Sequence, residues 1–150
     1  MKLSELLIEE RIVLDFDAKS KEDAIGALVG PVVNGFDRAT VVSEIMEREK
    51  LGSTGVGQGV AIPHIRMEPI LEPSVVFGRC SRPVDFDAID EEPCSLFFLV
   101  LGPTSADAQD GYLKTMAKIS RLMRSADVRQ QLLKAGSAAE IISAIATHES

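Results

Sequence analysis

Residues 95–101 read SLFFLVL, an almost unbroken apolar run. A strand with one face in water alternates apolar and polar side chains, whereas a continuous apolar run is typical of a strand covered on both faces. This run therefore requires a layer of structure on each side of a sheet. Together with the helical patterns around it, it predicts an α/β fold of the α+β kind: a three-layer α/β/α sandwich in which one mixed β-sheet is flanked by helices.

The other patterns along the chain predict the element order β-α-α-β-β-β-α-α-α. A single domain spanning residues 1–150 is expected, because no repeat, low-complexity tract or linker divides the chain. The first helix is expected to end or restart at Gly30-Pro31, and Asn34-Gly35 to close that segment. Strands are expected at residues 12–14, 60–62, 74–80 and 95–101, and helices after Ser20 and Asp37, from Gly111, at 128–134 and after Ser137.

The charge balance narrows the class of partner. Lysine and arginine number 16 and aspartate and glutamate 23, which gives a net charge of -7. This argues against nucleic acid, whose phosphates attract basic surfaces, and favours a protein or small molecule. The first residues lack the apolar stretch of a signal peptide, and no run approaches the roughly 18 apolar residues of a membrane span, so a cytoplasmic protein without membrane insertion is expected. With two cysteines and two histidines, reduced thiols and no metal site are predicted.

Residues 52–66 read GSTGVGQGVAIPHIR and place four glycines ahead of a Pro-His pair. Glycine is used where a backbone turns or comes close to something, so the segment suggests a site. It is not a Walker A loop, because Gln58-Gly59 stands where Lys and Ser/Thr are required, and it does not fit the dinucleotide fingerprint. A calcium loop at residues 85–90 is not expected either, because Ile89 occupies a ligand position.

The spacing of the glycines predicts how the segment runs. In an extended chain Gly55, Gly57 and Gly59 share one face, which leaves one side of the approach bare. Pro63 removes a donor from the strand ladder, so pairing is expected to stop near His64 and to leave its ring at a strand end.

An anionic group such as phosphoryl is the ligand that this segment suits. Backbone amides around Gly55 and Gly57, the hydroxyls of Ser53 and Thr54, and the guanidinium of Arg48 are all candidate phosphate-binding groups. Imidazole, with an ordinary pKa of about 6.5, offers a neutral, nucleophilic nitrogen at cellular pH. For His64 two interpretations stay open: a phosphoryl acceptor, or a ring that only caps a strand by hydrogen bonding.

The runs REKLGSTGVG, from Arg48 to Gly57, and GVAIPH, from Gly59 to His64, resemble a known family. It comprises the enzyme IIA domains of the bacterial phosphoenolpyruvate-dependent phosphotransferase system (PTS), of the fructose/mannitol and nitrogen-regulatory (Ntr) type. The resemblance extends to residues 3–21, 83–90 and 101–103. The family's three-layer fold with a mixed sheet agrees with the element order predicted above.

The resemblance implies a phosphotransferase that acts as a phosphohistidine carrier. His64 would take a phosphoryl group from the phosphohistidine of an HPr/NPr-type phosphocarrier protein, with Arg48 helping to hold the phosphate. In the family the Nε2 atom is generally the one phosphorylated. No cofactor or metal is implied, and the group can pass on to an enzyme IIB.

One position departs from the family pattern. Many relatives carry a second histidine at the start of the helix expected from Gly111, where this chain has Tyr112. A phenol donates one hydrogen bond but brings no positive charge, so the change bears on onward transfer to an enzyme IIB. Tyr112 is either a phosphate contact or a core residue packed on the apolar stripe of its helix. Lys114, Lys118 and Arg121 form a solvated face or, alternatively, a docking surface for an acidic partner.

Three functions are compatible with this resemblance. A free-standing chain whose opening resembles the nitrogen-regulatory branch favours a phosphorylation-dependent regulator of target proteins. The alternatives are a sugar-transport enzyme IIA that passes phosphoryl to a separate enzyme IIB, and an interaction module that is not phosphorylated. The intact set of Arg48, Gly55, Gly57 and His64 argues against the last.

Overall fold

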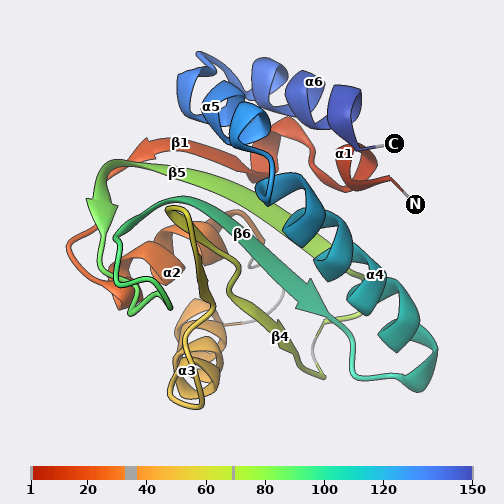
Figure 1. The fold of residues 1–150 in the computed structure, drawn as a ribbon. Helices are drawn as coiled ribbons and strands as arrows, with labels where there is room; N and C mark the ends of the chain where they lie inside the picture. The colour runs from red at the N-terminus through yellow and green to blue at the C-terminus, as the bar shows by residue number, and fades with distance from the viewer. Residues whose placement is uncertain (1, 33–36, 69, 150) are drawn as a thin grey trace.

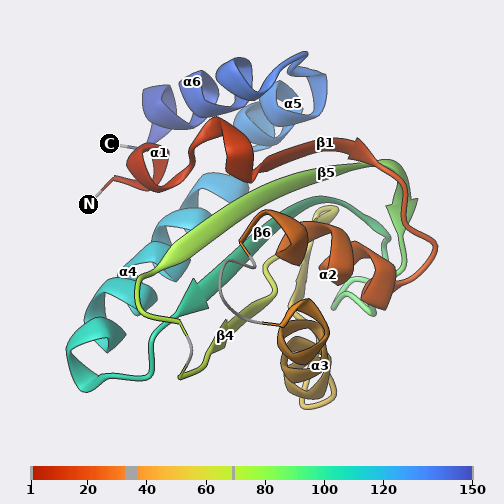
Figure 2. The same ribbon diagram turned by 180° about the vertical axis from the view of Figure 1, so that it is seen from behind.

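The protein forms three layers in the computed structural model, which describes residues 2–32, 37–68 and 70–149. A single sheet lies in the middle, with α4, α5 and α6 on one side (Figure 1) and α2 and α3 on the other (Figure 2). The predicted fold class is therefore confirmed. Asn34-Gly35, expected to close a segment, lies outside the described residues.

The sheet has the strand order β1-β5-β6-β3-β2, and β4 pairs with the same edge of β6 as β3. β1 pairs parallel with β5, β5 antiparallel with β6, both β3 and β4 parallel with β6, and β2 antiparallel with β3. The mixed sheet is as predicted, but β2 and β4 are additional strands. The bounds are β1 Ile12–Phe16, β2 Gly55–Gly57, β3 Val60–Ala61, β4 His64–Arg66, β5 Ser74–Val84 and β6 Cys94–Gly102.

The helices follow the predicted order, with one short helix added at the start. α2 begins after Ser20, whose side chain accepts a hydrogen bond from the Asp23 amide, and it ends before Gly30, where a 3-10 turn follows. α4 begins five residues before the expected Gly111. The sequence did not indicate this earlier start, because the first turns are exposed and carry no apolar stripe. The bounds are α1 Leu3–Leu6, α2 Lys21–Val29, α3 Arg38–Glu49, α4 Ala106–Met123, α5 Ala126–Lys134 and α6 Ala138–His148.

β6 is buried on both faces, as its apolar run predicts. Leu96, Phe98 and Val100 belong to the core beneath α4, α5 and α6. Phe97 and Leu99 belong to the opposite core, beneath α2 and α3. Since fully burying one such side chain stabilises the folded state by about 1.5–3 kcal/mol, this strand helps to hold both helical layers on the sheet.

The two ends of the described chain meet beside α1 (Figures 1 and 2). The carboxylate of Glu149, which is buried, accepts hydrogen bonds from the amides of Leu3, at 2.7 Å, and Ser4, and from the Ser4 hydroxyl. α1 is a single turn whose first amides have no partner within the helix, so a side chain from the far end of the chain satisfies them. No helix in the described part of the chain is long and apolar enough to cross a membrane.

Arg79 on β5 is a buried charge that joins the sheet to α5. Its guanidinium donates to both carboxylate oxygens of Asp15, at 3.0 Å each, and to the main-chain carbonyls of Leu132 and Ala135 at the end of α5. The hydrogen bond from Arg79 lowers the pKa of the Asp15 carboxyl below its usual value. One side chain therefore satisfies carbonyls that α5 leaves without helical partners.

We predict that Arg79→Met lowers the free energy of unfolding by about 2–4 kcal/mol, because it leaves buried carbonyls without donors. Arg82→Met is the matched control: Arg82 is exposed and pairs with Asp17 at 3.3 Å, so its loss should cost no more than about 1 kcal/mol. Urea unfolding of both variants measures the difference. Equal losses would show that Arg79 does not hold α5.

Candidate functional site

The glycine-rich segment forms a hairpin whose second strand leads to His64. β2 and β3 are joined by Gln58 and Gly59, whose φ values of 60° and 77° are both positive, as a tight turn of the primed type requires. The prediction that three alternate glycines share one face of an extended chain is therefore wrong, since Gly59 lies in the turn. The glycines nevertheless indicated correctly that the backbone turns in this segment, because glycine is favoured where φ is positive.

Strand pairing continues through His64, which corrects the prediction that it stops there. Pro63 lacks an amide proton, yet its carbonyl still accepts a hydrogen bond from the Val100 amide at 3.0 Å. β4 then begins at His64, opposite Val100 of β6. β6 is long enough to pair with both β3 and β4, so the proline interrupts the donors of the ladder without ending it. The backbone is therefore hydrogen-bonded to β6 at Pro63 and paired with β6 from His64 onward.

The His64 ring is held by its own strand. Its Nδ1 atom lies 2.8 Å from the main-chain oxygen of Ile62. A carbonyl oxygen can only accept, so Nδ1 carries the proton and the neutral ring presents an unprotonated Nε2. The ring is half-buried. This hydrogen bond is the one expected of a ring that caps a strand, and it also fixes the tautomer of the ring. The sequence had not indicated this partner.

Tyr112 of α4 forms one wall beside the histidine. Its ring centroid is 6.3 Å from that of His64, and only 6% of the residue is exposed. A Cβ atom on Gly102 would lie 2.6 Å from the Tyr112 ring, so glycine at the end of β6 lets the ring sit against the strand. Tyr112 is thus both a core residue, one of the two predicted roles, and a neighbour of His64.

Arg66 is a site neighbour that sequence reasoning missed. It lies two residues after His64 on β4, and its guanidinium carbon is 5.7 Å from the Tyr112 ring centroid. It donates to the carbonyls of Pro103 and Ser105, at 2.8 and 2.7 Å, and so fixes the segment that leads into α4. The period of two along a strand would have put Arg66 on the face of His64, had β4 been predicted.

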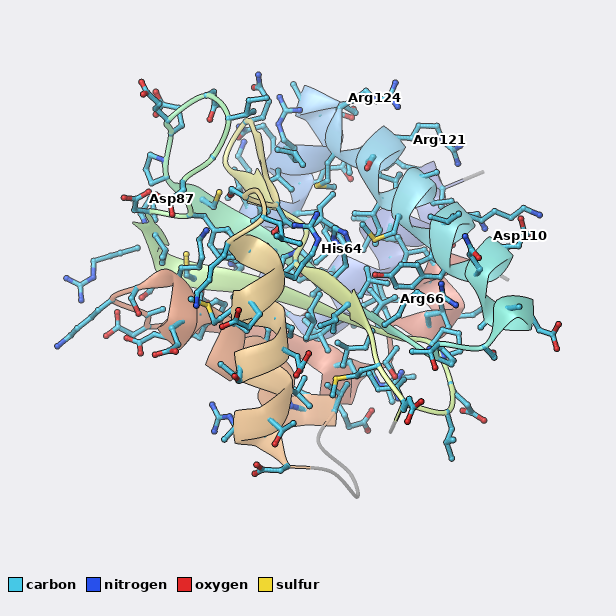
Figure 3. All side chains as sticks on the ribbon, turned by 90° about the horizontal axis from the view of Figure 1, so that it is seen from below. His64, Arg66, Asp87, Asp110, Arg121 and Arg124 are labelled. Carbon is cyan, nitrogen blue, oxygen red and sulfur yellow. The ribbon has the colours of Figure 1, made fainter. Side chains whose placement is uncertain are left out.

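Arg48, a predicted phosphate-binding residue, lies in the last turn of α3. Its Nη1 atom donates to the Gly52 carbonyl at 2.9 Å, which uses one of its five donor hydrogens. His64 lies between α3 and α4, with Arg66 toward α4 (Figure 3). Burial raises the pKa of Tyr112 to about 12, and the charges of Arg66 and Arg48 oppose this rise. The charge of each arginine therefore reaches Tyr112, the wall beside His64.

The two hydroxyls predicted to bind phosphate make structural hydrogen bonds. Thr54 donates its hydroxyl to Glu49 at 2.6 Å, and Ser53 donates to the carbonyl of Phe86. Each hydroxyl has one proton, so in this structure both protons are already used. Glu49 also accepts from the Thr54 amide and pairs with Lys21 at 3.2 Å. These contacts fix the loop that follows Arg48, and phosphate binding by Ser53 and Thr54 stays a prediction.

Gly55 and Gly57 have packing reasons to be glycine. A Cβ atom on Gly55 would lie 2.8 Å from Ala88, and Gly57 has a φ of 98° with Asp90 close by. The hairpin therefore lies directly against the loop at residues 85–90. A role for their amides in phosphate binding also stays a prediction. Within the described residues, no group of three or more histidine, cysteine or acidic side chains is placed to hold a metal ion.

Comparison with known proteins gives a consistent result. The family model "Phosphoenolpyruvate-dependent sugar phosphotransferase system, EIIA 2" matches residues 5–148. A nitrogen regulatory protein of Bradyrhizobium diazoefficiens is 35% identical over 148 residues, which cover 97% of this chain and 95% of that protein. The solved structure of the nitrogen regulatory protein IIA-Ntr from Neisseria meningitidis superposes with a TM-score of 0.89 at 34% identity, covering 95% of this chain and 98% of that one.

A second kind of relative is larger. The fructose-specific EIIABC component of the PTS in Bacillus subtilis is 33% identical over 152 residues, which cover 99% of this chain. The chain spans only 24% of that protein's length. The similarity therefore joins this chain to one part of a multi-component protein as well as to proteins of its own size.

Tyr112 offers a direct test of the site's environment, because the chain has a single tyrosine and no tryptophan. We predict that the ultraviolet absorbance of its phenolate titrates with a midpoint near 12, because burial disfavours the charged form. Since the folded-state pKa is raised, the folded protein should lose stability as the pH rises from 10 toward 12. A midpoint near 10, with circular dichroism showing a folded chain, would contradict the buried position.

Proposed function

Because the chain belongs to the EIIA 2 family of the phosphoenolpyruvate-dependent phosphotransferase system, we propose that it carries a phosphoryl group on Nε2 of His64. The observation that supports this most is the hydrogen bond from Nδ1 to the Ile62 carbonyl. It holds the proton on one nitrogen and leaves the lone pair on the other. The half-buried ring then offers a nucleophile in one orientation, which an incoming carrier meets without prior rearrangement.

The transfer step needs no outside proton. The Nε2 lone pair attacks phosphorus, and the bond between phosphorus and the imidazole nitrogen of the donor breaks, returning its electron pair to the donor ring. Nδ1 of His64 keeps its proton throughout. The ring gains positive character as the new bond forms, and the Ile62 carbonyl dipole stabilises it. Because one phosphohistidine replaces another, the rate depends on alignment and on stabilising the charge on the phosphoryl oxygens.

Arg48 is the group we assign to those oxygens. Its remaining donor hydrogens are available beyond the single hydrogen bond to Gly52, and guanidinium matches the geometry of phosphate oxygens. The predicted contributions of Gly55, Gly57, Ser53 and Thr54 then consist chiefly in fixing the loop that positions Arg48. Tyr112 stays neutral at cellular pH and forms a wall beside the ring.

The donor we propose is an HPr/NPr-type phosphocarrier, and the role that of a nitrogen-regulatory type regulator, in the cytoplasm. The nitrogen regulatory proteins of Bradyrhizobium diazoefficiens and Neisseria meningitidis support this role, because the chain matches each of these two over nearly its whole length. The alternative is a sugar-transport enzyme IIA that passes its phosphoryl group to an enzyme IIB, and the match to a fructose-specific component supports it. Transfer to a purified enzyme IIB separates the two roles.

We predict that phosphoenolpyruvate, enzyme I and an HPr-type carrier add the mass of one phosphoryl group to the protein, and that His64→Ala abolishes the addition. The chain provides a matched control, since His148 at the end of α6 is its only other histidine. His148→Ala should be phosphorylated like the native protein. Intact mass spectrometry measures all three.

Two outcomes would overturn this proposal. Phosphate that persists on His64→Ala and is labile in acid would place the acceptor elsewhere. A native protein that stays unmodified beside a carrier shown to be charged would favour the interaction module that is not phosphorylated.

We predict that Arg48→Gln slows phosphorylation of His64 by roughly a hundredfold, the usual effect of removing one preorganised donor to developing charge. Arg82→Gln controls for the general loss of a positive charge, because Arg82 is exposed and pairs with Asp17 on another part of the molecule. Single-turnover transfer from the labelled carrier measures the rates. Equal rates for both variants would remove Arg48 from the site.

A further inference from the structure

A hollow opens at the turn of the glycine hairpin, away from His64. It has a volume of about 410 Å³ and lies between the hairpin turn, the second half of α4 and the start of α5. His64, Arg48 and Tyr112 are not among the residues that line it. Seven residues do: Val56, Gly57, Gln58, Ser120, Met123, Arg124 and Arg129. Its size falls within the range of small-molecule sites, about 300–1,000 Å³.

The lining carries positive charge in an otherwise acidic protein. Arg124 and Arg129 belong to it, and each of the other lining residues is uncharged. Arg124 is exposed at the end of α4, next to Arg121 (Figure 3). Although the chain carries a net charge of -7, the two guanidinium groups at this hollow have no acidic residue beside them in its lining, so they form a local site for an anion.

Two acidic groups of the neighbouring elements, Asp90 and Asp127, have other partners. Asp90, behind the hairpin, accepts hydrogen bonds from the amides of Gln58 and Glu92, which lower the pKa of its carboxyl. Asp127, in the first turn of α5, accepts from the side chain of Gln131. Neither carboxylate is paired with Arg124 or Arg129, so neither cancels their charge by direct contact.

Arg129 is already held in place. Its Nη1 atom donates to the Met123 carbonyl at 2.6 Å, and its Nη2 atom donates to the Gln58 side chain at 3.3 Å. These bonds use two of its five donors and orient the plane of the group. An anion that binds the remaining donors does not have to order this side chain, which removes part of the entropic cost of binding.

The rest of the wall suits an apolar or aromatic group. Met123 is buried at the floor, and Val56 is about half exposed at the rim. A thioether packs favourably against aromatic rings, and guanidinium planes stack on them. Ser120, one turn before Arg124, adds a hydroxyl. The hollow therefore combines cationic groups for an anion with an apolar surface for a flat body.

We propose that this hollow is a binding site for a small organic phosphate with an aromatic body, of the nucleoside monophosphate class. The arginines bind the phosphate, and Met123 and Val56 contact the base. Its occupant touches the turn of the hairpin whose second strand leads through Pro63 to His64, so binding and the phosphoryl site share one element of structure.

The test is titration of the unphosphorylated protein with adenosine monophosphate, followed by amide chemical shifts and by calorimetry. We expect saturable binding, with shifts centred on Gly57, Gln58 and Ser120. Adenosine and inorganic phosphate, each tested alone, should bind at least about tenfold more weakly, since each lacks one half of the contacts.

Three variants assign the binding to this hollow. Arg124→Gln and Arg129→Gln should each weaken it by at least about tenfold, the usual effect of losing a charge-assisted hydrogen bond. Arg121→Gln is the matched control, because Arg121 is exposed on the same helix but does not line the hollow. Circular dichroism checks each variant for folding, and Arg124→Gln suffices if the Arg129 variant unfolds, because the side chain of Arg124 is exposed.

Four results would overturn the proposal. The first is the absence of saturable binding by the native protein. The second is equal weakening in Arg121→Gln, which would indicate attraction by general charge. The third is unchanged binding in Arg124→Gln. The fourth is a set of shifts centred on His64 and Tyr112, which would place the phosphate at the phosphoryl site instead.

Discussion

The structure depends on one strand being covered on both faces and paired on both edges. β6 pairs with β5 along one edge, and along the other it pairs first with β3 and then with β4. Its alternate side chains fill the two cores. A strand in this position cannot shift register by one residue without exchanging the contents of both cores. The position of His64 is constrained in the same way, because its backbone pairs with β6.

The orientation of the His64 ring depends on an interruption in an otherwise regular sheet. Pro63 has no amide proton to give to the ladder, and the Ile62 carbonyl just before it accepts a hydrogen bond from the histidine ring. A regular strand would point that carbonyl at its neighbour. The same local arrangement therefore anchors the ring and selects its tautomer. Arg66 lies on β4, and Arg48, which we assign to the phosphoryl oxygens, lies on α3, so the proposed site exists only when the sheet and its covering layer have assembled.

Much of the fold could be predicted from the sequence, because its strong signals are periodic or positional. The apolar run of β6 indicated two cores, and the serine cap before α2 and the Gly30-Pro31 stop were correct. The strands missed, β2 and β4, have three residues each, too few for a period of two to be visible. The glycines indicated close approach but not the partner, which is the loop at residues 85–90. The position of Arg66 could not be predicted because it depends on β4. The acceptor of the His64 Nδ1 proton could not be predicted because it depends on the local backbone at Ile62, between β3 and β4.

The contact between Glu149 and α1 has a consequence for the order in which the chain folds. The first amides of α1 obtain their acceptor from a carboxylate 146 residues further along the chain. β1 likewise pairs with β5, from which α2 and α3 separate it in the sequence. Bringing such distant segments together costs more loop-closure entropy than a local contact does, so we expect α1 and β1 to join the folded structure late.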